Sequence, residues 1–245
     1  GRLGINIDRV LAVEQQYSPV SFCWMDRHGA KTFYFYRFPG YSDPLGTLTE
    51  NAIEPGLFSS VRCFDFTEAA IRREPLRSAA FKAARLAREQ GCLVIYAVNY
   101  RPAPWAGREG EMLQAQRQAC SLADVVVMNE TEATMLTGFR DHLRAAAEVA
   151  SYGPTVVAVT GGDQGAWLWH RGQTGHVPAF EVPVLYDIGA GDAFHAGLAV
   201  ALLRNHEGAD AVRLASAVAA LKISRSASTD YLPTWEEACK LAGLS

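Results

Sequence analysis

The sequence predicts an α/β protein, a three-layer αβα sandwich built around a mainly parallel sheet. From residue 61 onward, segments with strand-like and helix-like patterns alternate along the chain. The strand-like segments, such as residues 92–97 and 125–128, are near-continuous apolar runs. Such runs are typical of parallel strands that are buried between two layers of helices. Residues 1–60 lack this alternation, so we expect them to stand apart from an α/β unit at residues 61–245.

The individual elements follow from apolar periodicity and from the residues that end helices. Strands are expected at residues 61–66, 92–97, 125–128 and 155–160. Helices are expected at residues 75–90, 109–122, 140–151 and 209–221. A short helix is expected from Glu130, and Gly91 ends the first helix of this series.

Another helix follows Gly191. Its apolar stripe consists of Phe194, Leu198 and Leu202. A second face carries only small residues, and we expect it to pack closely on a sheet: Ala193, Gly197 and Ala201.

Residues 1–60 contain a predicted β-hairpin. Two β-rich runs at residues 20–25 and 32–38 flank the turn Asp26-Arg27-His28-Gly29. The second run is dense in aromatic residues, which usually lie in a core or an interface. Arg37 within it could pair with a ligand carboxylate or hydroxyl. Residues 39–55 form a turn-rich connector without periodicity.

Composition excludes several classes of protein. The chain has 245 residues, 49% of them hydrophobic, which suffices for one sizeable core, and a net charge of −3 argues against nucleic-acid and membrane-surface binding. It has no apolar run of membrane-spanning length and no secretion signal at its start, so we expect a cytoplasmic location. Its five scattered cysteines fit reduced thiols. The motifs of zinc sites, Walker loops and dinucleotide-binding folds are absent from the sequence.

The strongest functional signal is the stretch D-I-G-A-G-D-A-F-H-A-G-L at residues 187–198. Because Gly189, Ala190 and Gly191 carry little or no side chain, their backbone N–H groups can approach an anion. The helix that follows adds the positive end of its dipole. Asp192 lies at the mouth of this turn, where a carboxylate could take the proton of a hydroxyl that attacks phosphorus. The stretch alone fits equally well a tight turn with a helix-capping Asp. His195 is interpreted as a packing or surface residue.

Polar residues follow three of the predicted strands, at the edge where ligands bind in such sheets. Each group has a structural alternative, for example Asn129 as a helix cap and Thr160 with its glycines as a hairpin turn. Their coincidence at one edge predicts a ligand site. The residues are Asn99 and Arg101 after the second strand, Asn129, Glu130 and Glu132 after the third, and Thr160, Gly162 and Gly165 after the fourth.

Four motifs together resemble the PfkB, or ribokinase-like, family of carbohydrate kinases, over the chain from its first residues to about Glu237. They are G-A-G-D-A-F-H-A-G at 189–197, V-T-G-G-D-Q-G-A at 159–166, M-N-E-T-E-A-T-M-L-T-G at 128–138 and N-Y-R-P-A-P-W at 99–105. The resemblance implies a ribokinase-like fold with a small β lid, represented in part by the hairpin at residues 20–38. It also implies ATP-dependent phosphorylation of a sugar with Mg²⁺, and K⁺ as a further candidate cofactor.

The resemblance also implies roles for single residues. Asp192 corresponds to the general base, and the backbone of Gly189, Ala190 and Gly191 to the anion hole. Glu132 corresponds to a residue that acts on Mg²⁺ through water. The residues that correspond to the ATP site are Asn129, Thr160, Gly162, Gly165 and Ser216. Those that correspond to contacts with the sugar or the phosphates are Arg37, Asn99 and Arg101.

Several departures from the family pattern suggest an alternative. Family members usually begin with a further segment of several dozen residues, and we expect that segment to be missing here. The usual Asp-x-Asn-x-Arg becomes A-V-N-Y-R at residues 97–101, which lacks the leading carboxylate. Asp187 is the remaining candidate for an Asp in a loop that often helps to bind a monovalent cation. A non-catalytic relative that binds a sugar or nucleotide and regulates another process is therefore the second hypothesis.

The motifs also favour a substrate and an assembly. N-x-R-P…W and the Y-x-Y-R strand are similar to the branch of 2-keto-3-deoxygluconate kinases and fructokinases. Arg37 would suit the carboxylate of an acid sugar, so 2-keto-3-deoxygluconate or fructose is the expected substrate. The hairpin resembles a lid that often pairs with its counterpart, so we also expect a homodimer through it.

Overall fold

A six-stranded sheet forms the centre of the protein. The computed structural model describes residues 4–25, 31–36, 44–225 and 232–244. The strands follow one another in sequence order across the sheet, and the first four are parallel: β3 (Cys63–Thr67), β4 (Leu93–Ala97), β5 (Val125–Asn129) and β6 (Val156–Thr160). The prediction of a mainly parallel sheet is confirmed.

An antiparallel hairpin, β7 (Ala166–His170) and β8 (Gln173–Val177), completes the sheet beyond β6. The sequence pattern does not predict these two strands. β8 is the edge strand, and four of its five residues are not buried. Because a half-solvated edge strand needs no apolar run, the signal used for the inner strands was absent here.

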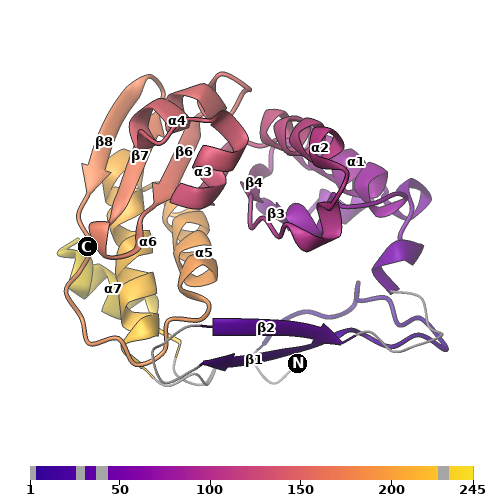
Figure 1. Ribbon diagram of the computed structural model, residues 1–245, viewed down its shortest axis with the longest axis horizontal. Helices are drawn as coiled ribbons and strands as arrows, with labels where there is room; N and C mark the ends of the chain where they lie inside the picture. The colour runs from indigo at the N-terminus through magenta and orange to yellow at the C-terminus, as the bar shows by residue number, and fades with distance from the viewer. Residues whose placement is uncertain (1–3, 26–30, 37–43, 226–231, 245) are drawn as a thin grey trace.

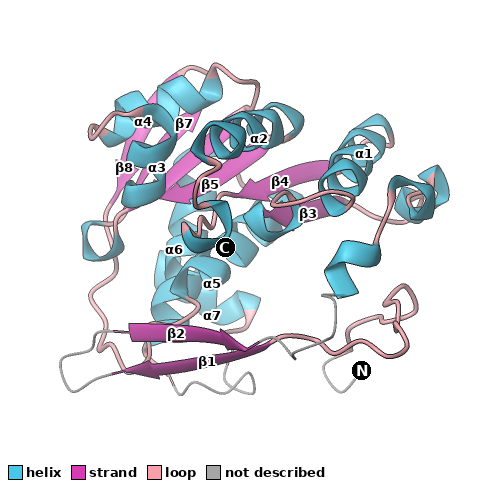
Figure 2. Cartoon of the chain, turned by 45° about the vertical axis from the view of Figure 1, so that its right-hand side comes forward, coloured by secondary structure: helices cyan, strands magenta, loops and turns pink. Residues whose placement is uncertain are grey.

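Helices cover both faces of the sheet (Figure 2). On one face lie α1 (Leu76–Glu89), α2 (Glu109–Leu122), α3 (Glu130–Thr137) and α4 (His142–Ala150). On the other lie α5 (Ala190–Leu203), α6 (Gly208–Ile223) and α7 (Trp235–Ala242), the last of which was not predicted. The predicted elements agree with these bounds to within two residues at each end. The three-layer architecture is thus confirmed.

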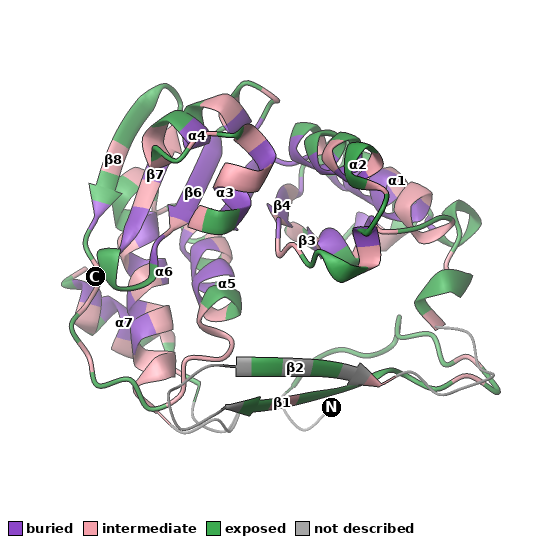
Figure 3. Ribbon diagram, viewed as in Figure 1, coloured by how far each residue is buried: buried purple, intermediate pink, exposed green. Residues whose placement is uncertain are grey.

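Each face of the sheet has its own apolar core, because alternate side chains of a strand point to opposite faces. Val94, Tyr96 and Val126 belong to the core beneath α1–α4. Ile95 and Val125, their neighbours in sequence, belong to the core beneath α5–α7. Figure 3 shows the buried residues along the sheet and on the inner sides of the helices.

The small-residue face of α5 packs on α6, not on the sheet as the sequence suggested. A Cβ added to Gly197 would lie 3.0 Å from the Cα of Ala215 and from the Cβ of Val218, both on α6. Phe194 and Leu198 instead bury the sheet-facing side of the helix. Two helices that share one face of a sheet approach closely only where side chains are small, which explains this use of glycine.

The direction of α5 places its start at the carboxyl edge of the sheet. His195, near its beginning, lies beside Asp65 of β3. At the end of α5, the carbonyl of Leu203 accepts a hydrogen bond from Nη2 of Arg62 (2.5 Å). Arg62 is the residue before β3. The helix therefore runs antiparallel to β3, and its N-terminus lies where the parallel strands end.

A separate two-stranded hairpin, β1 (Val20–Met25) and β2 (Lys31–Tyr36), lies on the side of the molecule where α5 begins (Figure 1). Its turn at residues 26–29 and the predicted ligand residue Arg37 are outside the described residues. The connector to the α/β unit contains three short 3₁₀ turns between Pro44 and Phe58. Among the described residues, every helix is too short or too polar to cross a bilayer.

Candidate active site

The strand ends bring the predicted polar residues to one edge. The β4–β5 ladder continues past β4, since the N–H of Val98 donates to the carbonyl of Val127 (3.0 Å). Asn129 pairs with Thr160 across β5 and β6. Asn99, whose φ of +36° turns the chain away from the sheet, therefore follows its strand at the same edge as Asn129 and Thr160. This is the arrangement that the sequence predicted.

Glu132 fastens two of these strand ends together. Its carboxylate accepts the N–H of Asn129 (2.9 Å) and the N–H of Tyr100 (2.8 Å), one on each oxygen. Asn129 Oδ1 in turn accepts the N–H of Glu132 (2.9 Å), which completes a capping box at the start of α3. Burial raises the pKa of Glu132, while these two amides and the guanidinium of Arg101 oppose the shift. The carboxylate thus has a structural role whatever it binds.

The residues fit Mg²⁺ only as an ion shared with phosphates. Among the described residues there is no group of three or more His, Cys, Asp or Glu side chains that could hold a metal alone. Mg²⁺ commonly takes one or two carboxylates and completes its shell with water and substrate phosphates. Because both oxygens of the buried Glu132 already accept amides, contact through a water molecule fits this residue.

The turn before α5 has the geometry expected of an anion site. Gly189 has a φ of +81°, in the left-handed region that favours glycine, and lies at the N-cap of the helix. The N–H of Ala190 donates to the carbonyl of Asp187 (3.1 Å) and that of Ala193 to Gly189 (2.9 Å). The N–H groups between them, those of Gly191 and Asp192, are the donors that a ligand could use. The N–H of Ala190, which the sequence also predicts as a donor to the anion, is already engaged with Asp187.

Asp192 lies beside this turn. Its Oδ2 is 3.9 Å from the point that a Cβ on Gly189 would occupy, so the carboxylate folds back toward the glycine. The residue is exposed, at the third position of α5. An exposed carboxylate next to unpaired amides at a helix start can receive a proton from a neighbouring alcohol.

Two further residues, Asp65 and His195, lie close enough to Asp192 for its charge to act on their pKa values, although the sequence does not assign them to the site. His195 Nε2 is 3.5 Å from Asp65 Oδ2, and the imidazole is buried. Burial lowers the pKa of His195, and the carboxylates of Asp65 and Asp192 oppose this. Burial also raises the pKa of Asp65, with an opposing effect of His195 and a further rise from Asp192. The signal available in the sequence was a charged residue in the middle of an otherwise apolar strand.

Gly162 and Gly165, in the β6–β7 turn, differ in whether the surrounding chain leaves room for a side chain. A Cβ on Gly165 would lie 2.1 Å from the carbonyl oxygen of Val177, so only glycine fits there for reasons of chain packing. Gly162 has a φ of +61° but open space around it. Thr160 is half-buried and its hydroxyl donates to the carbonyl of Met128 (3.5 Å). Ser216 is half-buried on α6.

The buried side chain of Trp105 holds the loop after β4 in place. Its indole N–H donates to Oε1 of Glu68, and both side chains are buried. Arg72 binds the other oxygen of Glu68 through Nε (2.8 Å). Arg101 is exposed and donates to the carbonyl of Tyr100 (3.0 Å). The Trp of the N-x-R-P…W run thus supports the loop that carries Asn99 and Arg101, and the sequence did not reveal its partner Glu68.

The residues before Gly189 do not fit a bound monovalent cation. The ammonium of Lys222, from α6, donates to the carbonyls of Tyr186 (3.1 Å) and Ile188. It therefore takes the loop oxygens that K⁺ would need. The expectation of a K⁺ site at Asp187 is not supported by this geometry, and no step of the reaction is assigned to K⁺.

Comparisons with known proteins show what the chain is similar to. The model of the pfkB family carbohydrate kinases matches residues 2–235. Fructokinase-1 of Zea mays is 30% identical over 234 residues, which cover 91% of this chain and 70% of that protein. A 5-dehydro-2-deoxygluconokinase of Shouchella clausii is 27% identical over 193 residues, 78% of this chain and 59% of that protein.

Solved structures share the fold. A fructokinase from Xylella fastidiosa with bound ATP superposes with a TM-score of 0.80 at 23% identity, over 94% of this chain and 72% of the other. The fructokinase from Vibrio cholerae, in its fructose-, ADP- and calcium-bound form, gives a TM-score of 0.75 at 26% identity, over 91% of this chain and 73% of the other. From its fold, its motifs and these matches, the chain belongs to the pfkB family of carbohydrate kinases.

Proposed function

We propose that the protein transfers the γ-phosphoryl group of ATP to a hydroxyl of a sugar, with Asp192 as the general base. The observation that carries the proposal is the position of the Asp192 carboxylate beside the Gly189 turn, at the start of α5. An alcohol held between this carboxylate and the amides of Gly191 and Asp192 would lose its proton to Asp192 as its oxygen bonds to the γ-phosphorus, while the bond from that phosphorus to the oxygen of ADP breaks. Phosphoryl transfer depends mainly on positioning and charge stabilisation, which amides at a helix start supply.

The strand-end residues are proposed to hold the nucleotide. Asn129, at the N-cap of α3, faces the same edge as Thr160 and Gly162, and its exposed amide could bind a phosphate. Ser216 and Gly165 complete the set proposed from the family motifs. Mg²⁺, when bound between the phosphates, would neutralise their charge, and Glu132 would orient one of its water molecules. Relatives solved with ATP or ADP support a nucleotide at this fold.

The proposed substrate is fructose or a keto-deoxy sugar acid such as 2-keto-3-deoxygluconate. Relatives named fructokinase and 5-dehydro-2-deoxygluconokinase support this class. Asn99 and Arg101, on the loop after β4, are proposed to contact the sugar, together with Arg37. An arginine pairs with a carboxylate through two parallel hydrogen bonds, so the proposal favours the acid sugar.

The test measures ADP release from ATP and Mg²⁺ with fructose, 2-keto-3-deoxygluconate and 5-dehydro-2-deoxygluconate. Asp192→Asn should lower kcat by about 10²–10⁴-fold, the usual contribution of a general base, while calorimetry shows unchanged ATP binding. Asp210→Asn is the matched control, because Asp210 is the third residue of α6 as Asp192 is of α5, and is also exposed. It should keep wild-type turnover.

Two results would contradict the proposal. Equal kcat in Asp192→Asn and in the wild type would exclude Asp192 as the base. Measurable ATP binding without turnover of any of these sugars by the wild type would favour the second hypothesis, a regulatory relative that binds a nucleotide or sugar without catalysis.

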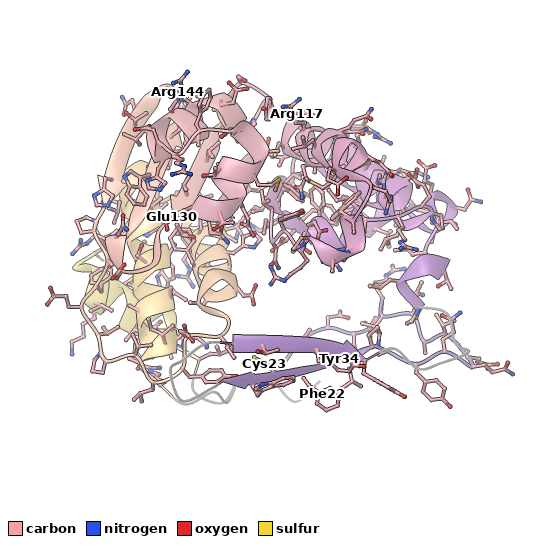
Figure 4. The ribbon with its side chains drawn as sticks, in the orientation of Figure 1. Phe22, Cys23, Tyr34, Arg117, Glu130 and Arg144 are labelled. Atoms are coloured by element: carbon pink, nitrogen blue, oxygen red, sulfur yellow. The ribbon has the colours of Figure 1, made fainter. Side chains whose placement is uncertain are left out.

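We further propose that a second copy of the chain packs on the hairpin. Phe22 and Tyr34 face each other across β1 and β2, and Trp24 lies on the same face. All three side chains are more than half exposed, and Figure 4 shows Phe22 and Tyr34 projecting from the hairpin away from the α/β unit. An isolated hairpin is marginal in water, and a two-fold contact would cover this apolar face in both copies. Light scattering that gives only the monomer mass would contradict a dimer.

A further inference from the structure

The loop that leads into the Gly189 turn is held on one side by the end of α6. The N–H groups of Leu185 (2.8 Å) and Tyr186 (3.0 Å) both donate to the carbonyl of Ile223, the last residue of that helix. The neighbouring side chain, Lys222, binds the acceptors of the same loop, because its ammonium donates to the carbonyls of Tyr186 (3.1 Å) and Ile188. Two consecutive residues of α6, Lys222 and Ile223, thus provide the hydrogen-bond partners of this loop: Ile223 accepts from its N–H groups, and Lys222 donates to its carbonyls.

The ammonium lies next to the proposed anion site. A Cβ on Gly189 would lie 3.7 Å from Lys222 Nζ and 3.9 Å from Asp192 Oδ2. The ammonium and the proposed base therefore flank the same glycine. The Lys222 Nζ also lies 4.8 Å from the ring centroid of Tyr186, and both side chains are half-buried. The cation is held by two carbonyl oxygens and the face of an aromatic ring.

Such surroundings are those of a bound monovalent cation. Proteins hold K⁺ with backbone carbonyl oxygens that replace its hydration shell. An ammonium group carries the same charge and also binds carbonyl oxygens, to which it donates hydrogen bonds through its three N–H groups. Here the cation is covalently part of α6, so no free ion is needed to hold the two carbonyls in place.

We propose that Lys222 is a positioning residue that acts as a built-in monovalent cation for the phosphoryl-transfer turn. By fixing the carbonyls of Tyr186 and Ile188, it holds the backbone so that the N–H groups of Gly191 and Asp192 face the phosphate. Its charge also lies close to the negative charge that develops during transfer. The inference rests on the proposed kinase function, and it accounts for the poor fit of a K⁺ site at Asp187.

Removal of the ammonium should loosen this loop without unfolding the protein. The two N–H bonds to Ile223 remain in Lys222→Ala, and alanine suits a helix. The first measurement is amide hydrogen exchange of peptides that cover residues 185–193, in KCl and in choline chloride of equal ionic strength. Wild-type exchange should be the same in both salts. Lys222→Ala should exchange about tenfold faster in choline chloride, as expected for losing hydrogen bonds to a charged donor, and should recover in KCl.

The second measurement is turnover. In choline chloride, Lys222→Ala should lose at least about tenfold in kcat with ATP affinity nearly unchanged, and KCl or NH₄Cl should restore it. Lys222→Arg, which keeps a charge, should retain part of the activity without added cation. The control is Lys240→Ala, which removes an exposed lysine from the last turn of α7 and should behave as the wild type in every salt.

Three results would overturn the inference: a wild type that depends on K⁺, a Lys222→Ala variant that exchanges at the wild-type rate in choline chloride, or one that neither KCl nor NH₄Cl restores. The exchange experiment needs no turnover. A wild type that is inactive with every sugar would therefore contradict the proposed function, while the role of Lys222 in holding the loop is still decided by the exchange rates.

Discussion

The Nε2 atom of His195 lies 3.5 Å from Oδ2 of Asp65 and so joins the first turns of α5 to the edge strand β3. The imidazole is only 7% exposed, and its Nε2 has no hydrogen bond of good geometry among the described residues. Asp192, three residues earlier on α5, also acts on the pKa of both groups. The direction in which α5 presents Asp192 therefore depends in part on this contact.

This contact predicts a pH dependence of stability. Burial lowers the pKa of folded His195 below the 6.5 of the unfolded chain, so the unfolded state binds more protons in that window. The free energy of unfolding should thus fall as the pH is lowered through about 6.5, and His195→Gln, which cannot titrate, should lose that part of the slope. Urea unfolding at pH 5, 6 and 7 measures it.

The carboxylate of Asp65, which faces His195, changes the pH dependence of stability in the opposite direction. Because the pKa of Asp65 is raised in the folded state, this residue contributes stability below pH 3.8. That contribution is lost as the pH rises through the pKa of the folded state. Asp65→Asn removes the contribution of Asp65 to the pH dependence of stability, so that the contribution of His195 can be measured separately. Identical slopes between pH 5 and 7 for the wild type and His195→Gln would show that burial of the imidazole does not control its protonation.

Substitutions in the β6–β7 turn should separate packing from ligand binding. Gly165→Ala should cost about 4 kcal/mol or more, because its Cβ would overlap the carbonyl of Val177, which is backbone and cannot move alone. Gly162→Ala, also at positive φ but in open space, should cost only about 1–2 kcal/mol. Urea unfolding compares them. Equal costs would contradict the packing role of Gly165.

The buried carboxylate of Glu68 should be important for stability. Glu68→Ala leaves the guanidinium of Arg72 and the indole N–H of Trp105 without their partner, which should cost about 3 kcal/mol. Glu207→Ala removes an exposed ion pair with Arg171 (3.5 Å) and should cost about 0.5 kcal/mol. Thermal and urea unfolding measure both. A similar loss in the two variants would show that burial of Glu68 adds nothing.

Secondary structure was predictable wherever burial was complete. The bounds of α2, Glu109–Leu122, agree with the predicted range of 109–122, because its apolar and small residues recur with the helical period. β5 and β6 were found because both faces of each strand are covered. The β7–β8 hairpin was missed, since the polar residues of β8 face solvent and leave no apolar run. Likewise, α7 was missed because it is only eight residues long.

In the candidate site, the order of residues along the chain is enough to predict which of them follow the strands and the Gly189 turn, among them Asn129, Glu132 and Asp192. Local order is enough for this, because the edge of a parallel sheet collects the residues that come after each strand. Which side chains meet across elements depends on the folded protein: Asp65 contacts His195, Glu68 contacts Trp105, and Lys222 contacts the loop before Gly189. These partners lie 34 to 130 residues apart, and no local pattern encodes a contact that arises only when separate helices and strands pack together.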